Sequence, residues 1–238
     1  LTEGTQDATI YSIFVSGADV YAGGWIFSSG KGVATIWKNG TAQALSDGMT
    51  NASIYSVCVS GTDVYAGGYV LNDSDKWVAT LWKNGTAQQL SDGATNAKIW
   101  SVCVSGTDVY AGGFVQNASD YRVATIWKNG TPQALTDGSQ FAEIHSVYVS
   151  GTDVYAGGYA RNASGREIAT VWKNGTPQAL SEYADVNSVF VSGKDVYAGG
   201  RIVSISSTYI AALWKNGTQQ ILSDENTFAA VRSVFVAK

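Results

Sequence analysis

Trp37-Lys38-Asn39-Gly40 is the first of five copies of one tetrapeptide in this chain. The later copies begin at Trp82, Trp127, Trp172 and Trp214. A second motif, Val-Tyr-Ala-Gly-Gly, keeps the same step and begins at Val20, Val64, Val109, Val154 and Val196. The period is about 45 residues, and fixed periods of this length are typical of propellers, solenoids and arrays. We therefore interpret the whole chain as one structural unit copied head to tail.

The first half of each unit is interpreted as a β-hairpin. In the second copy, residues 54–59 form a short run rich in β-branched side chains, which predicts a strand. Residues 60–63, Ser-Gly-Thr-Asp, predict a turn, and we expect Asp63 to cap it by accepting backbone N–H groups. The next strand contains two adjacent glycines, which are costly in a strand unless another backbone comes close.

The second half of each unit is interpreted as another hairpin. A loop of variable sequence leads to residues 78–82, a third short strand that ends in the repeated Trp. The Asn-Gly pair that follows is the strongest short-range hairpin signal, because both residues of the tight turn need positive φ. Residues 86–90 form the fourth strand. We expect the repeated Trp and Tyr side chains to pack between neighbouring units.

Four short antiparallel strands per unit, with no helical pattern, predict an all-β fold of the β-propeller type. The prediction is a single five-bladed propeller domain over 1–238, with one surplus terminal strand. The expected repeats are 10–53, 54–98, 99–143, 144–185 and 186–229, and the surplus strand is 230–238. A parallel β-helix is the alternative, but its coils have no use for an Asn-Gly hairpin.

The surplus strand arises because the first-strand motif occurs six times and the other strands five times. Either residues 10–15 or residues 231–236 can complete the first blade. The other segment is expected to fray or to dock on an exposed strand edge by β-addition. Self-association through residues 230–238 or 8–16 is therefore a candidate partner interaction.

The aromatic residue followed by Ala-Gly-Gly, as in Tyr65-Ala66-Gly67-Gly68, resembles the blade of kelch-type propellers. The constant Trp lies in the third strand here, whereas kelch repeats usually carry it in the fourth. The chain also resembles tandem Trp-Lys-Asn-Gly repeats of bacterial secreted or surface proteins, and its blade number is that of the tachylectin-type lectins. These resemblances imply a β-propeller and an extracellular or cell-surface location.

Composition narrows the range of partners. The net charge is −4, and the fifteen Lys and Arg residues are spread along the chain, so we expect neither nucleic acid nor membrane insertion. Cys58 and Cys103 occupy equivalent positions in successive units, which favours two free thiols over a disulfide. His145 is the single histidine, so no metal site and no cofactor is predicted.

Candidate ligand-binding residues come from positions where the five copies differ. One set follows Gly-Gly and the other begins the first strand. The residues of the first set are Trp25, Tyr69, Phe114, Tyr159 and Arg201, and those of the second are Tyr55, Trp100 and His145. Aromatic rings beside amides and carboxylates are suited to sugars, although such rings also pack simply between blades.

Catalysis receives little support from the sequence. Propeller glycosidases need carboxylates in the central funnel, and the expected innermost strands contain no Asp or Glu. The leading hypothesis is therefore a non-catalytic extracellular module with lectin-like binding of a glycan, or of a protein ligand, on the variable loop face. The alternative is a structural subunit that assembles through its spare terminal strand.

Overall fold

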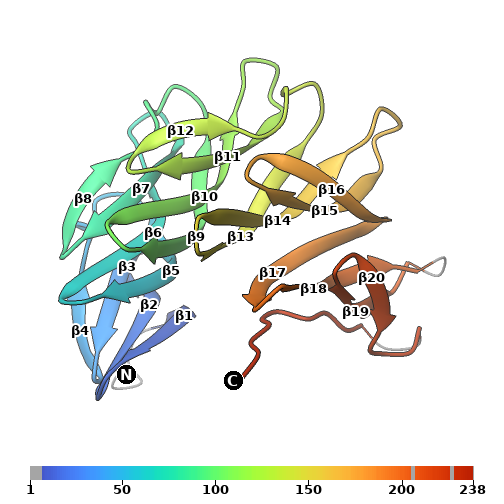
Figure 1. Cartoon of the computed structure of the whole chain (residues 1–238). Helices are drawn as coiled ribbons and strands as arrows, with labels where there is room; N and C mark the ends of the chain where they lie inside the picture. The colour runs from blue at the N-terminus through green and yellow to red at the C-terminus, as the bar shows by residue number, and fades with distance from the viewer. Residues whose placement is uncertain (1–6, 205–206, 226–227, 238) are drawn as a thin grey trace. The chain divides into compact units, whose positions relative to one another are not determined.

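The computed structural model describes residues 7–204, 207–225 and 228–237, and all of the secondary structure in these ranges is β (Figure 1). The strands form five separate four-stranded antiparallel sheets, each with its strands in chain order. These sheets are the blades of a five-bladed β-propeller, as the repeat predicted. Among the described residues, no helix is long and apolar enough to cross a bilayer.

The strand bounds follow the repeat closely. Blade 1 comprises β1 (Ala8–Ser16), β2 (Asp19–Ser28), β3 (Lys31–Lys38) and β4 (Thr41–Ala44). Blade 2 comprises β5 (Ala52–Ser60), β6 (Asp63–Leu71), β7 (Trp77–Lys83) and β8 (Thr86–Gln89). Blade 3 comprises β9 (Ala97–Ser105), β10 (Asp108–Gln116), β11 (Arg122–Lys128) and β12 (Thr131–Ala134). Blade 4 comprises β13 (Ala142–Ser150), β14 (Asp153–Arg161), β15 (Glu167–Lys173) and β16 (Thr176–Glu182). Blade 5 comprises β17 (Ala184–Ser192), β18 (Asp195–Val203), β19 (Tyr209–Lys215) and β20 (Thr218–Ile221).

The chain divides into two compact units. One contains Leu1–Ala118 and Trp127–Pro132, and the other contains Ser119–Ile126 and Gln133–Lys238. In the first unit, β1 lies against β5 and β5 against β9; in the second, β13 lies against β17. The first strands of successive blades therefore pack on one another within each unit.

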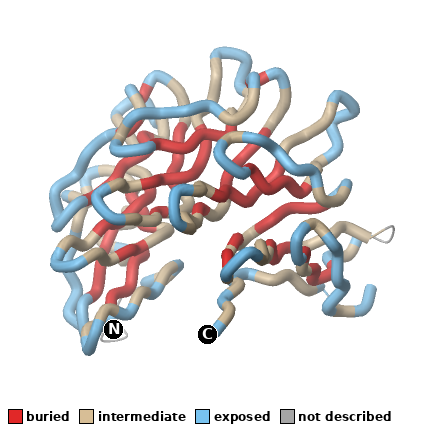
Figure 2. The backbone as a smooth tube through the Cα atoms, in the orientation of Figure 1, coloured by how far each residue is buried: buried red, intermediate tan, exposed pale blue. Residues whose placement is uncertain are grey.

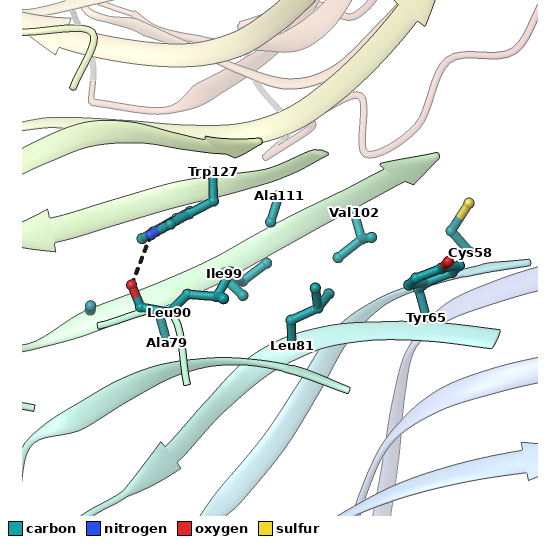
Figure 3. Close-up of a cluster of buried hydrophobic side chains, with 10 residues drawn as sticks. Cys58, Tyr65, Ala79, Leu81, Leu90, Ile99, Val102, Ala111 and Trp127 are labelled. Carbon is teal, nitrogen blue, oxygen red and sulfur yellow. Dashed lines mark hydrogen bonds between the residues drawn. The ribbon is translucent and has the colours of Figure 1, made fainter. Parts of the chain in front are cut away.

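The buried residues, red in Figure 2, lie mainly on the inner strands of the blades. They form hydrophobic clusters whose members come from neighbouring blades, so the core lies between blades. The short strands β4, β8, β12 and β20 are exposed along their whole length. The repeated Trp side chains are each only 1 % exposed, as expected for packing between blades. Figure 3 shows one of these tryptophans in the core between blades 2 and 3. The indole N–H of Trp127 in β11 donates to the carbonyl oxygen of Leu90 at 3.0 Å, beside Ile99.

The two glycines of the Gly-Gly pair are required for different reasons. A Cβ on Gly67 would lie 2.4 Å from Val102 and 2.6 Å from Ile99, both on the first strand of the next blade. A Cβ on Gly68 would lie 1.9 Å from the backbone oxygen of Ser53, on the paired strand of the same blade. The first glycine thus admits the neighbouring blade, and the second admits the backbone of its own hairpin.

The two terminal segments have different positions. The N-terminal strand β1 pairs with β2 and completes blade 1. Residues 228–237 form no strand but lie along blade 5, where Ser188 Oγ accepts from the N–H of Val234 at 3.0 Å. Ser12 accepts from Val57 in the same way at the border of blades 1 and 2. The C-terminal segment therefore takes the position of a first strand in a further repeat.

Candidate ligand-binding site

One end of each blade carries the constant turns, which are tied to each other. In blade 2, Asn84 Nδ2 donates to Asp63 Oδ1 at 2.8 Å, and Lys83 Nζ lies 2.7 Å from Asp63 Oδ2. The prediction that Asp63 caps its turn through backbone N–H groups was wrong, because its carboxylate accepts from side chains of the other hairpin. Hydrogen bonds from Lys83 and Asn84 hold the pKa of Asp63 below its usual value. The same contacts recur in all five blades, so this end is architectural.

The opposite end of each blade carries the variable side chains, and a β-bulge positions them. The register of the first strand shifts between Ile54 and Ser56, which leaves Tyr55 without a paired residue on β6. Equivalent register shifts place Tyr11, Trp100, His145 and Asn187 at the bulges of the other blades. A bulge redirects the side chain that it releases. His145 Nδ1 accordingly lies 3.1 Å from the backbone oxygen of Val186, on the next blade.

Next to each bulge lies a small site between two neighbouring blades, which we name the slot. The second residue of a blade's first strand points to this site, where the strand meets the preceding blade. That residue is Ser53 in blade 2, Lys98 in blade 3, Glu143 in blade 4 and Asp185 in blade 5. All four residues are buried. The four residues hold the same place in their strands, but their chemistry differs.

The slot between blades 2 and 3 contains a lysine among aromatic rings. The Lys98 ammonium lies 3.5 Å from the ring centroid of Trp77 and 4.7 Å from that of Tyr69. Trp100 and Tyr55 follow at 5.3 and 5.9 Å. Cations within about 6 Å of a ring are attracted to its negative face, most strongly where water is excluded. Four rings thus surround one buried ammonium group.

The slot of blade 4 contains an ion pair. Arg122, at the start of β11, donates to the carboxylate of Glu143, which also accepts from the Tyr159 hydroxyl at 2.9 Å. Burial opposes ionisation of Glu143, but His145, Arg122 and Tyr159 outweigh it and hold the pKa of this carboxyl below its usual value. Burial and the nearby Glu143 carboxylate raise the pKa of Tyr159, so its hydroxyl remains a donor.

The slot of blade 5 contains a second ion pair, in which Arg201 Nε donates to Asp185 Oδ2 at 2.7 Å. On blade 4, Arg161 pairs with Glu167 at 2.9 Å. Glu143 and Asp185 both belong to first strands, so the expectation that these strands lack acidic residues was wrong. The Glu143 carboxylate is paired with Arg122, and the Asp185 carboxylate is paired with Arg201.

The slot between blades 1 and 2 is hollow. Ser53 takes the position of Lys98, and Gly32 takes that of Trp77. A cavity of about 290 Å³ remains there, and its aromatic walls are Tyr11, Trp25, Phe27, Tyr55 and Tyr69. Asn51 lies at its edge, where its Oδ1 accepts from the N–H of Gly32 at 2.8 Å.

The polar groups of this cavity include the hydroxyls of Ser53, Tyr55 and Tyr69. Ser53 is 3 % exposed, and its Oγ makes no well-formed hydrogen bond with a described residue, although it lies close enough to the Tyr55 hydroxyl to act on the pKa of Tyr55 as a hydrogen-bond partner. Burial, with the neighbouring phenols, raises the pKa of Tyr55, and burial also raises the pKa of Tyr69. Both hydroxyls are therefore neutral donors at physiological pH.

Two other cavities have a simpler explanation. One of about 280 Å³ lies beside Trp82 at the constant end of blades 1 and 2, and one of about 190 Å³ lies beside Trp214 in the equivalent place of blades 4 and 5. Because they repeat with the Trp, we attribute them to the packing of the blades. In the part of the chain that the structure describes, no group of three or more His, Cys, Asp and Glu side chains is suited to a metal ion.

The predicted site residues fall into three groups. Trp25, Tyr55 and Tyr69 line the hollow slot. Trp100 faces Lys98, and Tyr159, Arg201 and His145 contact neighbouring protein groups. Phe114 is 1 % exposed and belongs to the core.

Sequence reasoning did not place Ser53, Lys98, Glu143 and Asp185 at one recurring buried position between blades, and it missed Gly32; a cluster of Glu143 and Asp185 with arginines such as Arg201 was considered only as a weak signal. A signal was present, since each of the four directly precedes the constant Ile or Val of the first strand yet differs from copy to copy.

Comparison with known proteins supports the fold alone. No family model matches the chain, and no curated protein matches it, so the kelch-like resemblance is not confirmed. Among solved structures, TolB from Acinetobacter baumannii is similar with a TM-score of 0.58 at 9 % sequence identity. The match covers 90 % of this chain and 54 % of the TolB chain, so this chain spans about half of that structure's length. Fold and repeats together define a five-bladed β-propeller.

Proposed function

We propose that the protein is a non-catalytic, extracellular or cell-surface binding module with lectin-like recognition of carbohydrate. The observation that carries the proposal is the hollow slot, whose cavity of about 290 Å³ has five aromatic side chains in its lining. This volume is at the lower limit for small-molecule sites and suits one or two sugar rings. Fold alone does not support this function, because propellers serve many.

The chemistry of the cavity is consistent with a sugar. Trp25 and Tyr69 offer ring faces to C–H groups, and neutral Tyr hydroxyls offer donors to sugar oxygens. The paired state of Glu143 and Asp185 supports binding over hydrolysis, because each carboxylate is already engaged by an arginine. A glycosidase needs one protonated and one free carboxyl group at the scissile bond.

The test is a glycan array followed by calorimetric titration of any ligand found. Replacing Trp25 by Ala should abolish binding without changing the thermal unfolding midpoint by more than a few degrees. Tyr209→Ala is the matched control, because Tyr209 is a partly exposed aromatic residue outside the cavity. Binding that survives Trp25→Ala, or an array without any ligand, would contradict the proposal.

A second candidate function is assembly through the terminal segments 8–16 and 230–238. Its supporting observation is exposed apolar surface on both: Ile13 is 65 % exposed, Val15 62 % and Phe235 78 %. Such side chains are typical of a surface that another chain covers. Sedimentation velocity over a hundredfold concentration range should reveal oligomers that Phe235→Ser reduces; a monomer at all concentrations would exclude this candidate.

A further inference from the structure

We infer that the hollow slot between blades 1 and 2 binds an organic ammonium group. The inference rests on the proposed small-ligand site and assigns its ligand class. The neighbouring slot, between blades 2 and 3, already contains an ammonium group that belongs to the chain itself. Lys98 thus shows what this backbone position accommodates.

The two slots correspond residue by residue. Around Lys98 stand Tyr55, Tyr69 and Trp100. Their counterparts one blade earlier are Tyr11, Trp25 and Tyr55, in the same strand positions. All three counterparts are aromatic and line the cavity. The electron-rich ring faces that attract the Lys98 ammonium are therefore present in the hollow slot as well.

Two substitutions create the space. Ser53 is shorter than Lys98 by the three outer atoms of the side chain, and Gly32 has no side chain where blade 2 carries Trp77. A Cβ on Gly32 would meet nothing closer than 3.5 Å, so the glycine is not required by crowding. The aromatic ring lost with Trp77 is replaced in part by Phe27, which also lines the cavity.

The buried Ser53 hydroxyl adds a polar group at the base of this cavity. It has no well-formed hydrogen bond to a described residue. A serine hydroxyl can donate one hydrogen bond and accept others. A lysine-like ligand would thus place its ammonium group among the rings and its other end near the Ser53 hydroxyl.

The test uses propylammonium, which reproduces lysine from Cγ to Nζ, with 1-propanol as its neutral isostere. Titration followed by NMR should show saturable binding of propylammonium at one site, at least about tenfold tighter than 1-propanol. The same preference should make glucosamine a better ligand than glucose. Equal binding of the charged and neutral probes would overturn the inference.

Three variants test whether the hollow slot corresponds to the slot that contains Lys98. Ser53→Lys should fill the slot with the chain's own ammonium and abolish propylammonium binding while the protein remains folded. Gly32→Trp, which copies blade 2, should also fill it and covers the case in which Ser53→Lys does not fold. Lys98→Ala should open a second slot and raise the stoichiometry of propylammonium binding from one to two. Unchanged binding in a folded Ser53→Lys or Gly32→Trp protein would overturn the assignment.

The outcomes separate this inference from the proposed function. If glucose and glucosamine bind equally and both are lost in Ser53→Lys, carbohydrate binding stands and the ammonium preference falls. If propylammonium binds and no glycan does, the slot is an ammonium site and the lectin proposal falls. If none of the probes binds, both fall.

Discussion

The buried hydrogen bond of the repeated Trp should contribute measurably to stability, and blades 1 and 2 provide a matched pair to test it. Trp82 and Trp37 are each 1 % exposed and occupy the same position in the first unit of the chain. The indole N–H of Trp82 donates to the Leu45 carbonyl oxygen at 3.0 Å, whereas that of Trp37 has no partner among the described residues. Replacement by Phe removes the same atoms from both.

The expected magnitudes follow from this difference. Loss of ring volume costs each variant part of the 3–5 kcal/mol that complete truncation of a buried aromatic residue costs, roughly 1–2 kcal/mol. Trp82→Phe also loses a hydrogen bond worth about 1 kcal/mol and leaves a carbonyl oxygen without that donor. Trp37→Phe removes an N–H that is already unsatisfied. Trp82→Phe should therefore be less stable than Trp37→Phe by about 1–2 kcal/mol.

The assay is urea unfolding followed by far-UV circular dichroism, with the slope of the transition checked for both variants. Equal slopes are needed, because a changed slope signals loss of two-state behaviour. Equal destabilisation of the two variants, within the error of the extrapolation, would refute the reasoning, and so would a greater cost for Trp37→Phe. In either case the indole would act by its size alone.

Three further predictions concern other parts of the fold. Gly68→Ala should destabilise the protein by more than about 2 kcal/mol in urea unfolding, since its Cβ would lie 1.9 Å from a backbone oxygen, whereas Gly32→Ala should change stability by less than about 0.5 kcal/mol. The pKa of Glu143 is lowered in the folded protein, so its ionised carboxylate stabilises the fold at pH values above the usual pKa of 4.5. This stabilisation is lost as the pH falls through the lowered pKa of the folded protein. Glu143→Gln should therefore flatten the dependence of the thermal unfolding midpoint on pH over this acidic range. Burial raises the pKa of Cys58 to about 11, so at pH 8 this thiol should react with iodoacetamide at least tenfold more slowly in the folded than in the urea-unfolded protein, and equal rates would contradict its burial.

The architecture could be predicted from sequence because its determinants are local. Asn84 and Gly85 both have positive φ, 49° and 85°, as the tight hairpin turn requires. The same pair recurs in every blade, so five turns and a constant period were enough to define the strands. The repeated Trp was assigned to the core for the same reason, and its burial confirms that assignment.

The slot could not be predicted because its determinants are not local. Each first strand begins two residues earlier than the repeat boundaries suggested, at Ala52, Ala97, Ala142 and Ala184. Lys98 and Glu143 therefore looked like polar residues of a link between units, and charged side chains are rarely buried unless they are paired. Their partners, Trp77 and Arg122, belong to the third strand of the preceding blade. Only the packing of blade on blade brings them together.

The four slots show why the hollow one is the place to look for a ligand. Burying a charge is costly unless nearby groups compensate it; aromatic rings lie close to the Lys98 ammonium, and arginines lie beside Glu143 and Asp185. Ser53 imposes no such cost, yet the rings remain around it, and Tyr11 is still 50 % and Phe27 45 % exposed. Folding thus leaves aromatic surface in contact with water in the one slot that lacks a charged occupant. A bound ligand would remove that surface from water, which the three filled slots achieve with the chain's own side chains.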